Sequence, residues 1–336
     1  MNTAIELGLI YAIMAIGVYL TFRILDFPDL TVDGSFTTGG ATAAVLIVND
    51  VHFLLAMAAA FAVGTVAGLV TGLLHTKGNI NGLLAGILTM IALYSINLRI
   101  MGKANVPLLG EDTAFSFMRS LGASSGSWAL IAILLVLILL LKLIVDWFLS
   151  TDLGLSLQAT GDNEEMIRSF GVSTDRMKIL GLMLSNGLVA LCGAVVAQQQ
   201  GFADISMGIG LILVGLASVI VGQALLGTRT VFMATLAVIV GAVIYRLAIY
   251  FALTAGLNAN DMKLISAILV VAALLLPQAK IFRRIGGLRR DRGAVSDIAA
   301  DGAQGSPALA TSAAAPSASP AADVPRPGSS QEADRA

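Results

Sequence analysis

Charge is what this chain has least of. Only 12% of its 336 residues are charged, whereas 57% are hydrophobic. Soluble globular domains carry about 25% charged residues, so this composition excludes an ordinary soluble fold and favours an integral membrane protein in contact with lipid. The formal net charge is −1, and no basic patch is interleaved with aromatic residues, so we expect no nucleic-acid partner.

Cysteine and the common catalytic motifs are also missing. The single cysteine, Cys192, lies in an apolar run and excludes a disulfide framework. The sequence has no Gly-x-x-x-x-Gly-Lys-[Ser/Thr] phosphate-binding loop and no His-Glu-x-x-His zinc motif. The Gly-x-Ser-x-Gly match at 122–126 follows a loop rather than a strand, and no histidine comes after it. We therefore expect no enzymatic activity, no metal and no cofactor in this chain.

Long apolar runs dominate the sequence. A helix needs about 20 apolar residues to cross a bilayer. Eight runs come near that length: 4–23, 51–75, 81–97, 127–147, 177–196, 207–226, 231–253 and 262–281. A ninth run, 34–48, is short and follows a proline-containing turn. The sequence predicts an all-α integral membrane protein, a polytopic bundle of eight or nine transmembrane helices whose second helix is short or broken.

Basic residues predict the orientation of these helices. Lys280, at the end of the last run, and five arginines between 283 and 292 place that flank in the cytoplasm. With nine spans the N-terminus would lie outside; with eight, the turn after the first span would be re-entrant and the N-terminus inside. We expect a transmembrane domain at 1–285 and a disordered cytoplasmic tail, rich in Ala, Pro and Ser, at 286–336.

Small residues recur four apart at Gly64, Gly68 and Gly72. This spacing lets two helix backbones approach closely. We expect it to serve packing within the chain rather than dimerisation.

The loop between the runs at 127–147 and 177–196 predicts a short helix at 163–170. Asp162 can cap its N-terminus, Glu165 three residues later completes a capping-box pair, and Gly171 suits the left-handed position that ends a helix. Met166, Ile167 and Phe170 lie at helical spacing and give this helix a partly apolar surface. Such a surface fits a protein partner or the membrane interface equally well.

The turn "LDFPDLTVDGSF" at 25–36 holds three aspartates in a chain poor in charge. Pro28 disfavours helix before it, and Thr31 or Asp33 can cap a helix that starts at Gly34. Carboxylates are favourable at a helix N-terminus. Broken helices inside membranes also form transporter binding sites, so both capping and pathway lining are open interpretations.

Polar residues within the runs are further candidates for a translocation pathway. Arg246 could pair with a carboxylate, extend to the interface or contact an anionic group of a solute. Asn97 and Asn186 either face the pathway or form hydrogen bonds between helices. The candidate pathway residues are Asp29, Thr31, Asp33, Asn97, Asn186 and Arg246.

The segment "TDLGLSLQATGDNEEMIRSFGVSTDR" at 151–176 resembles the cytoplasmic loop of the branched-chain amino acid permease family of ABC importers. Gly154, Ala159, the stretch Gly171–Arg176 and Gly193 carry the resemblance. It extends through "AGILTMIALYSINLRIMG" and "GLASVIVGQALLG" and covers roughly 4–281. One turn departs from the family pattern, because "LDFPDLTVDG" is acidic where the family has a nearly neutral "NFAHG" turn.

The resemblance implies a multi-pass permease subunit of the inner membrane, which forms the pathway for a small solute of amino-acid type. A periplasmic or lipoprotein binding protein would deliver the solute, a separate ABC ATPase subunit would use the ATP, and a second permease copy, identical or paralogous, would complete the pathway. The short helix would be the coupling helix that contacts the ATPase through Asp162, Asn163, Glu164, Glu165, Met166, Ile167, Arg168, Phe170 and Gly171. An alternative is an ion-coupled secondary transporter with Asp26, Asp29 or Asp33 as its protonation site.

Overall fold

The computed structural model describes residues 1–120, 122–124, 126–227, 230–255, 264, 267–268 and 270–271. Each of the eight predicted apolar runs within these residues contains a helix. Among the described residues, six helices are long and apolar enough to cross a membrane: Asn2–Ile24, Phe53–Thr76, Gly82–Met101, Trp128–Leu149, Thr174–Gln200 and Val231–Thr254. The predicted run at 262–281 falls largely outside the described residues, and the predicted tail at 286–336 falls wholly outside them.

The elements follow one another as helices interrupted by two short strands. They are α1 (Asn2–Tyr19), its π-helical extension η1 (Leu20–Ile24), α2 (Thr31–Val48), α3 (Phe53–Thr76), α4 (Gly82–Met101), β1 (Asn105–Pro107), α5 (Ala114–Ser120), α6 (Trp128–Leu149), α7 (Asp152–Asp162), α8 (Glu164–Ser169), α9 (Thr174–Gln200), β2 (Phe202–Asp204), α10 (Leu211–Leu226) and α11 (Val231–Thr254). α7 was expected to be loop. It is a helix because Thr151 caps it, its hydroxyl accepting a hydrogen bond from Gly154 N.

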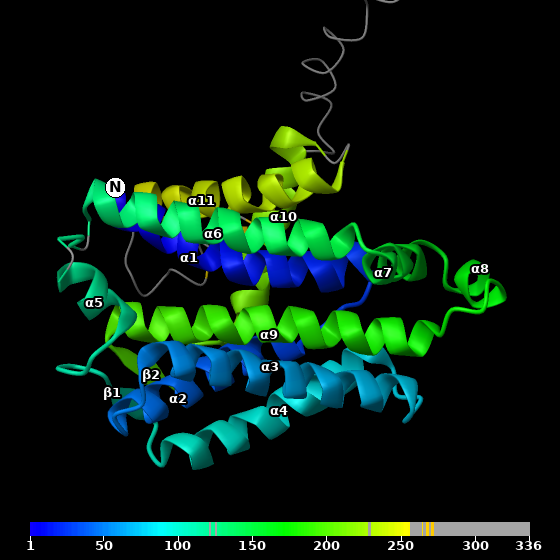
Figure 1. Ribbon diagram of the computed structural model, residues 1–336, viewed down its shortest axis with the longest axis horizontal. Helices are drawn as coiled ribbons and strands as arrows, with labels where there is room; N and C mark the ends of the chain where they lie inside the picture. Colours follow the sequence, from blue (N-terminus) through cyan, green and yellow to red (C-terminus); the bar gives the residue numbers. More distant parts are fainter. Residues whose placement is uncertain are drawn as a thin grey trace, which may run out of the picture. The chain divides into compact units, whose positions relative to one another are not determined.

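α9 lies between two groups of helices (Figure 1). One group contains α1, α6, α10 and α11, and the other contains α2, α3 and α4. α9 packs directly against α1, α2 and α3. The glycines of α3 allow this approach, because a Cβ on Gly68 would overlap the Leu182 carbonyl group of α9. The expectation that these glycines serve packing within the chain is confirmed.

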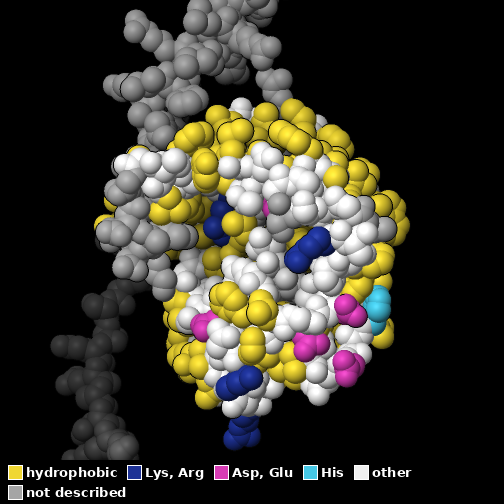
Figure 2. Space-filling view, turned by 90° about the vertical axis from the view of Figure 1, so that its left-hand side faces the viewer, with side chains coloured by type: hydrophobic (Ala, Val, Ile, Leu, Met, Phe, Trp, Pro, Cys, Tyr) yellow, Lys and Arg dark blue, Asp and Glu magenta, His cyan; other side chains and the backbone are white. Residues whose placement is uncertain are grey.

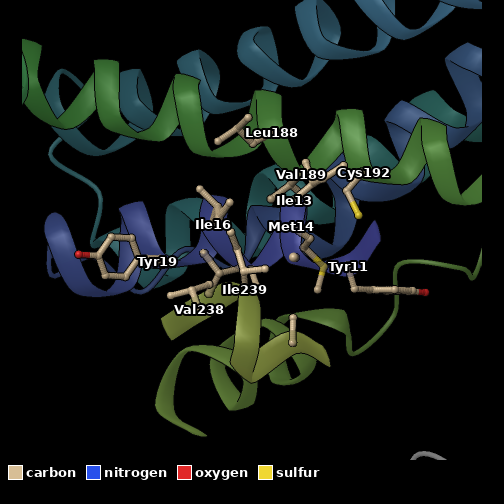
Figure 3. Close-up of a cluster of buried hydrophobic side chains, with 14 of the residues drawn as sticks. Tyr11, Ile13, Met14, Ile16, Tyr19, Leu188, Val189, Cys192, Val238 and Ile239 are labelled. Atoms are coloured by element: carbon tan, nitrogen blue, oxygen red, sulfur yellow. The ribbon is translucent and has the colours of Figure 1, made fainter. Parts of the chain in front are cut away.

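α1 is the most enclosed of the long helices and forms the centre of the apolar core. Figure 3 shows Ile13 and Ile16 of α1 between Leu188 and Val189 of α9 on one side and Val238 and Ile239 of α11 on the other. In a membrane protein an apolar helix can contact either lipid or protein, and α1 is covered mainly by protein. The apolar side chains of α1 therefore bind the two groups of helices together through one continuous core.

The helices have two distinct ends (Figure 1). At one, here called the α8 end, α7 and α8 lie beside the turn that follows η1 and the turn between α3 and α4. At the other, here called the sheet end, β1 pairs antiparallel with β2 beside α5. The N-terminus is at the sheet end, where Asn2 Nδ2 donates a hydrogen bond to the Gly126 carbonyl at 2.8 Å. α1 therefore runs from the sheet end to the α8 end, and α2 runs back.

Candidate translocation site and coupling helix

The turn between η1 and α2 is held by a buried carboxylate. Asp29 is only 2% exposed. Its Oδ1 accepts a hydrogen bond from Thr31 N at 2.9 Å, and its Oδ2 accepts one from Asn186 Nδ2 of α9 at 2.6 Å. The prediction that Thr31 or Asp33 caps a helix starting at Gly34 is wrong, because α2 begins at Thr31 and Asp29 provides the acceptor for its first N–H.

Three of the candidate pathway residues meet in this network. Asn186 also accepts a hydrogen bond from the Ser35 hydroxyl at 2.7 Å, and the hydroxyls of Thr31 and Thr71 lie 2.8 Å apart. Asp29, Thr31 and Asn186 therefore join α2, α3 and α9 through groups whose hydrogen bonds are made inside the protein. Of the two interpretations left open by the sequence, their contacts match the bonding between helices.

Asp33 caps a different helix from the one expected. Its Oδ2 accepts from Gly210 N at 2.7 Å and its Oδ1 from Ile212 N at 2.9 Å, at the N-terminus of α10. The Thr37 hydroxyl accepts a further bond from Gly208 N at 3.1 Å. A carboxylate is favourable here because the first N–H groups of a helix have no partners within it.

α10 is consequently a short helix that begins against the middle of the protein rather than at its sheet end. The predicted run at 207–226 is continuous in hydropathy, yet residues 205–210 form turns and the helix starts only at Leu211. Nonhelical backbone among apolar helices is tolerated where protein groups satisfy it. Here Asp33 and Thr37 of α2 provide those groups. Broken helices of this kind are a recurring element of transporter binding sites.

A cavity of about 410 Å³ lies beside this break, between α2, α4 and the segment that precedes α10. Its lining residues are Asp33, Gly34, Thr37, Met90, Ile91, Tyr94, Ser95, Asn97, Ile205 and Ile209. Asn97 is 1% exposed, and its Nδ2 donates to the Gly34 carbonyl at 3.5 Å. The structure thus brings two candidate pathway residues, Asp33 and Asn97, to one cavity.

Arg246 lies apart from these groups on α11. Its guanidinium carbon lies 3.6 Å from the centroid of the Tyr11 ring of α1, a contact that was not among the alternatives considered from the sequence. A cation over an aromatic face gains electrostatic stabilisation without a buried anion. Arg246 therefore connects α11 to α1.

α6 contains an ion pair that was not predicted from the sequence. Lys142 is 1% exposed, and its Nζ lies 2.5 Å from Asp146 Oδ2 and 3.0 Å from the centroid of the Phe232 ring. Asp146 Oδ1 accepts a further bond from the Thr235 hydroxyl of α11 at 2.7 Å. The signal was a lysine four residues before an aspartate inside an apolar run, a spacing that places both on one helix face.

α8 matches the predicted short helix to within one residue at each end. Its cap differs from the prediction, because Asp162 ends α7 and Asn163 Oδ1 accepts the bond from Met166 N at 2.9 Å. The polar partners belong to Glu164 rather than to Glu165. Gly171 has a φ of +85°, so the left-handed ending is confirmed.

Glu164 anchors α8 to α9. Its carboxylate contacts Arg168 at 2.8 Å and Lys178 of α9 at 2.6 Å, and it accepts a hydrogen bond from the Thr174 hydroxyl at 3.1 Å. The hydrogen bond from Lys178 lowers the pKa of Glu164. α8 has no buried residue, and it presents Phe170, 75% exposed, and Met166, 47% exposed. It is therefore a fixed projection with an apolar tip.

The sheet end carries a second large groove, of about 630 Å³. Its lining residues include Asp50, His52, Glu111 and Asp112. Figure 2 views this end and shows acidic side chains gathered on one side of it, beside a histidine. The two ends thus differ in chemistry, with an acidic groove at one and an apolar projection at the other.

Apolar helices long enough to span a bilayer, with a short helix broken inside the bundle and capped by a neighbour, define a multi-spanning membrane transport protein. The family model "Branched-chain amino acid transport system / permease component" matches residues 2–274. The chain belongs to this family of ABC-type permeases.

Individual relatives agree with the family. The chain is 47% identical over 267 residues to the "Tyrosine transport system permease protein" of Clostridioides difficile (strain R20291), covering 80% of this chain and 88% of that one. It is 26% identical over 277 residues to the "Ribose import permease protein RbsC" of Escherichia coli (strain K12), covering 80% and 82%. It is 28% identical over 286 residues to the "Galactofuranose transporter permease protein YtfT" of the same strain, covering 84% and 80%. No solved structure matches the chain. These relatives are transport permease subunits and not enzymes.

Proposed function

We propose that this chain forms the translocation pathway for a small solute, an amino acid, in an ABC importer of the inner membrane. A binding protein delivers the solute at the sheet end, a separate ATPase subunit binds and hydrolyses ATP at the α8 end, and two permease copies, identical or paralogous, enclose the pathway. The observation that carries the proposal is α8, a capped and anchored helix with no buried residue and an exposed apolar tip.

An ATPase groove suits this projection. Exposed aromatic and thioether side chains on a rigid element are typical of interface anchors. The contact surface we propose comprises Asp162, Asn163, Glu164, Glu165, Met166, Ile167, Arg168, Phe170 and Gly171. Movement of α8 passes to α9 through Glu164 and Lys178, and α9 holds α2 through Asn186 and Asp29. The contacts support a path from the ATPase to the broken helix.

Nine spans fit this arrangement, with α2 and α10 as short ones. The turn after η1 lies at the α8 end and the N-terminus at the sheet end. If the α8 end is cytoplasmic, the N-terminus is outside, and the last span that the sequence predicts, at 262–281, would return the C-terminus to the cytoplasm. The basic residues that follow 280 agree with that side.

An amino acid is the solute we favour over a sugar. The relative named for tyrosine transport shares 47% identity with this chain, whereas the ribose relative shares 26%. Among the candidate pathway residues, Asp33 and Asn97 line the cavity, and Asp29, Thr31, Asn186 and Arg246 hold helices in place. An ion-coupled transporter finds no such support, because both oxygens of Asp29 and of Asp33 accept hydrogen bonds from groups of the protein.

Co-purification with a candidate ABC ATPase subunit from the same organism tests the proposal. Phe170→Ser and Met166→Ser should each lower recovery of the ATPase about tenfold or more, since each removes an apolar anchor from an interface. Leu109→Ser is the matched control, because Leu109 is 90% exposed and belongs to the sheet end. Unchanged ATPase recovery and unchanged uptake in both α8 variants, with the protein folded, would refute the coupling role.

A further inference from the structure

Asn97, one of the residues that line the cavity beside the α10 break, has an amide atom without a hydrogen-bond partner among the described residues. This atom, Asn97 Oδ1, is buried. Asn97 Nδ2 points to the Gly34 carbonyl, which leaves Oδ1 as the free end of the amide. A buried acceptor without a donor is costly, so a donor from outside the chain is expected to bind there. Rotation about the broad χ2 torsion of Asn can turn Oδ1 toward the cavity.

The other polar groups deep in the cavity are already occupied. Asp33 accepts bonds from Gly210 N and Ile212 N, and the Thr37 hydroxyl donates to the Asp33 carbonyl and accepts from Gly208 N. Tyr94 and Ser95 are exposed at the cavity's edge. The remaining side chains of the lining are apolar: Met90, Ile91, Ile205 and Ile209.

This lining distinguishes between classes of solute. A sugar carries hydroxyl groups on every side and would leave most of them without partners against methionine and isoleucine. An aromatic side chain finds apolar surface and a thioether, with which aromatic rings make favourable contacts. The cavity volume of about 410 Å³ is typical of small-molecule pockets, which range from roughly 300 to 1,000 Å³.

We propose that this cavity is the intramembrane subsite for an amino acid with an aromatic side chain. The ring lies against the apolar lining, and the ammonium group donates a hydrogen bond to Asn97 Oδ1. This inference rests on the proposed function and adds to it the class of solute and the residue that selects it.

Protection of a single cysteine tests the subsite directly. The chain has one natural cysteine, Cys192, which is buried, so Ser95→Cys in a Cys192→Ala background places one reactive thiol at the cavity. The assembled transporter, in proteoliposomes and without nucleotide, is labelled with N-ethylmaleimide in the presence of L-tyrosine or D-ribose. L-tyrosine should slow labelling about tenfold, as expected for an occupied pocket, and D-ribose should not. Leu98→Cys, on the exposed face of the same helix, is the matched control and should be labelled equally in all cases.

Asn97→Leu adds a second measurement. It should abolish protection by L-tyrosine and raise the concentration for half-maximal tyrosine uptake about tenfold, the effect of losing roughly one good hydrogen bond. Thr89→Val is its control, because Thr89 is buried on α4 and its hydroxyl bonds within the helix. That variant should leave both measurements unchanged.

The outcomes separate the two proposals. Tyrosine uptake without protection of the Ser95→Cys variant would overturn the subsite and leave the proposed function standing. Protection by D-ribose would overturn the aromatic class. Absence of uptake of any amino acid, with ATPase and binding protein present, would overturn the proposed solute and this subsite together.

Discussion

Two buried asparagines, Asn186 on α9 and Asn97 on α4, show how differently the same side chain is used on either side of α2. Asn186 makes hydrogen bonds to Asp29 and Ser35 and joins helices. Asn97 makes one long bond to Gly34 and leaves its oxygen without a partner among the described residues. The difference teaches that burial alone does not reveal the role of a polar group in a membrane protein. Whether its bonds are completed within the chain is more informative.

Lys142 offers the largest test of a group whose bonds are complete. Lys142→Met should lower the free energy of unfolding by about 3–5 kcal/mol, because it leaves the largely buried Asp146 carboxylate without its lysine partner. The double variant Lys142→Met/Asp146→Leu should recover most of this loss. Thermal unfolding in detergent measures both. A single variant as stable as the natural chain would show that the pair is not desolvated.

Substitution of each asparagine by leucine should give the next largest difference in stability. Asn186→Leu should lower the free energy of unfolding by about 1–3 kcal/mol for each group that loses its partner, namely the Asp29 carboxylate and the Ser35 hydroxyl. The free energy of unfolding of Asn97→Leu should stay within about 0.5 kcal/mol of that of the natural chain, because the substitution removes a group that lacks a full set of hydrogen-bond partners. Equal losses of stability in the two variants would contradict the comparison.

Asp33 gives a smaller and more local effect. Asp33→Ala should lower the free energy of unfolding by about 0.5–2 kcal/mol, as the loss of other helix caps does. Hydrogen exchange of the backbone amides should increase at Gly210 and Ile212, which lose their acceptor, and not in α11. Loss of uptake in Asp33→Asn, with the protein folded and assembled, would show that Asp33 does more than cap α10.

The smallest effect concerns pH. Lys178 holds the pKa of Glu164 below its usual value of 4.5, so the contribution of Glu164 to anchoring α8 is complete above that value and is lost as pH falls through the lowered pKa. Amide exchange in α8 should therefore rise relative to the rest of the chain as pH falls below 4.5, and not above it. Glu164→Gln should show faster exchange at every pH, and Glu165→Gln should behave like the natural chain.

The helices were predictable from the sequence because apolar runs and their ends are local properties. Gly171 could be placed for the same reason, since only the chain around it determines its left-handed backbone. The cap on α10 could not be predicted from the local sequence. The carboxylate that accepts the Gly210 N–H belongs to Asp33, 177 residues earlier in the chain. The ion pair between Lys142 and Asp146 was not predicted, because their helix is so apolar that its mean hydropathy stays at 3.1 despite two charged residues.

The contact between Asp33 and α10 has a mechanical consequence. Two N–H groups at the N-terminus of α10 donate hydrogen bonds to one carboxylate of α2, so these bonds attach the start of α10 to α2. At its other end α10 stops at Gly227, whose φ of +80° is open to glycine and strained for other residues. A displacement of α2 would therefore carry the first turn of α10 with it.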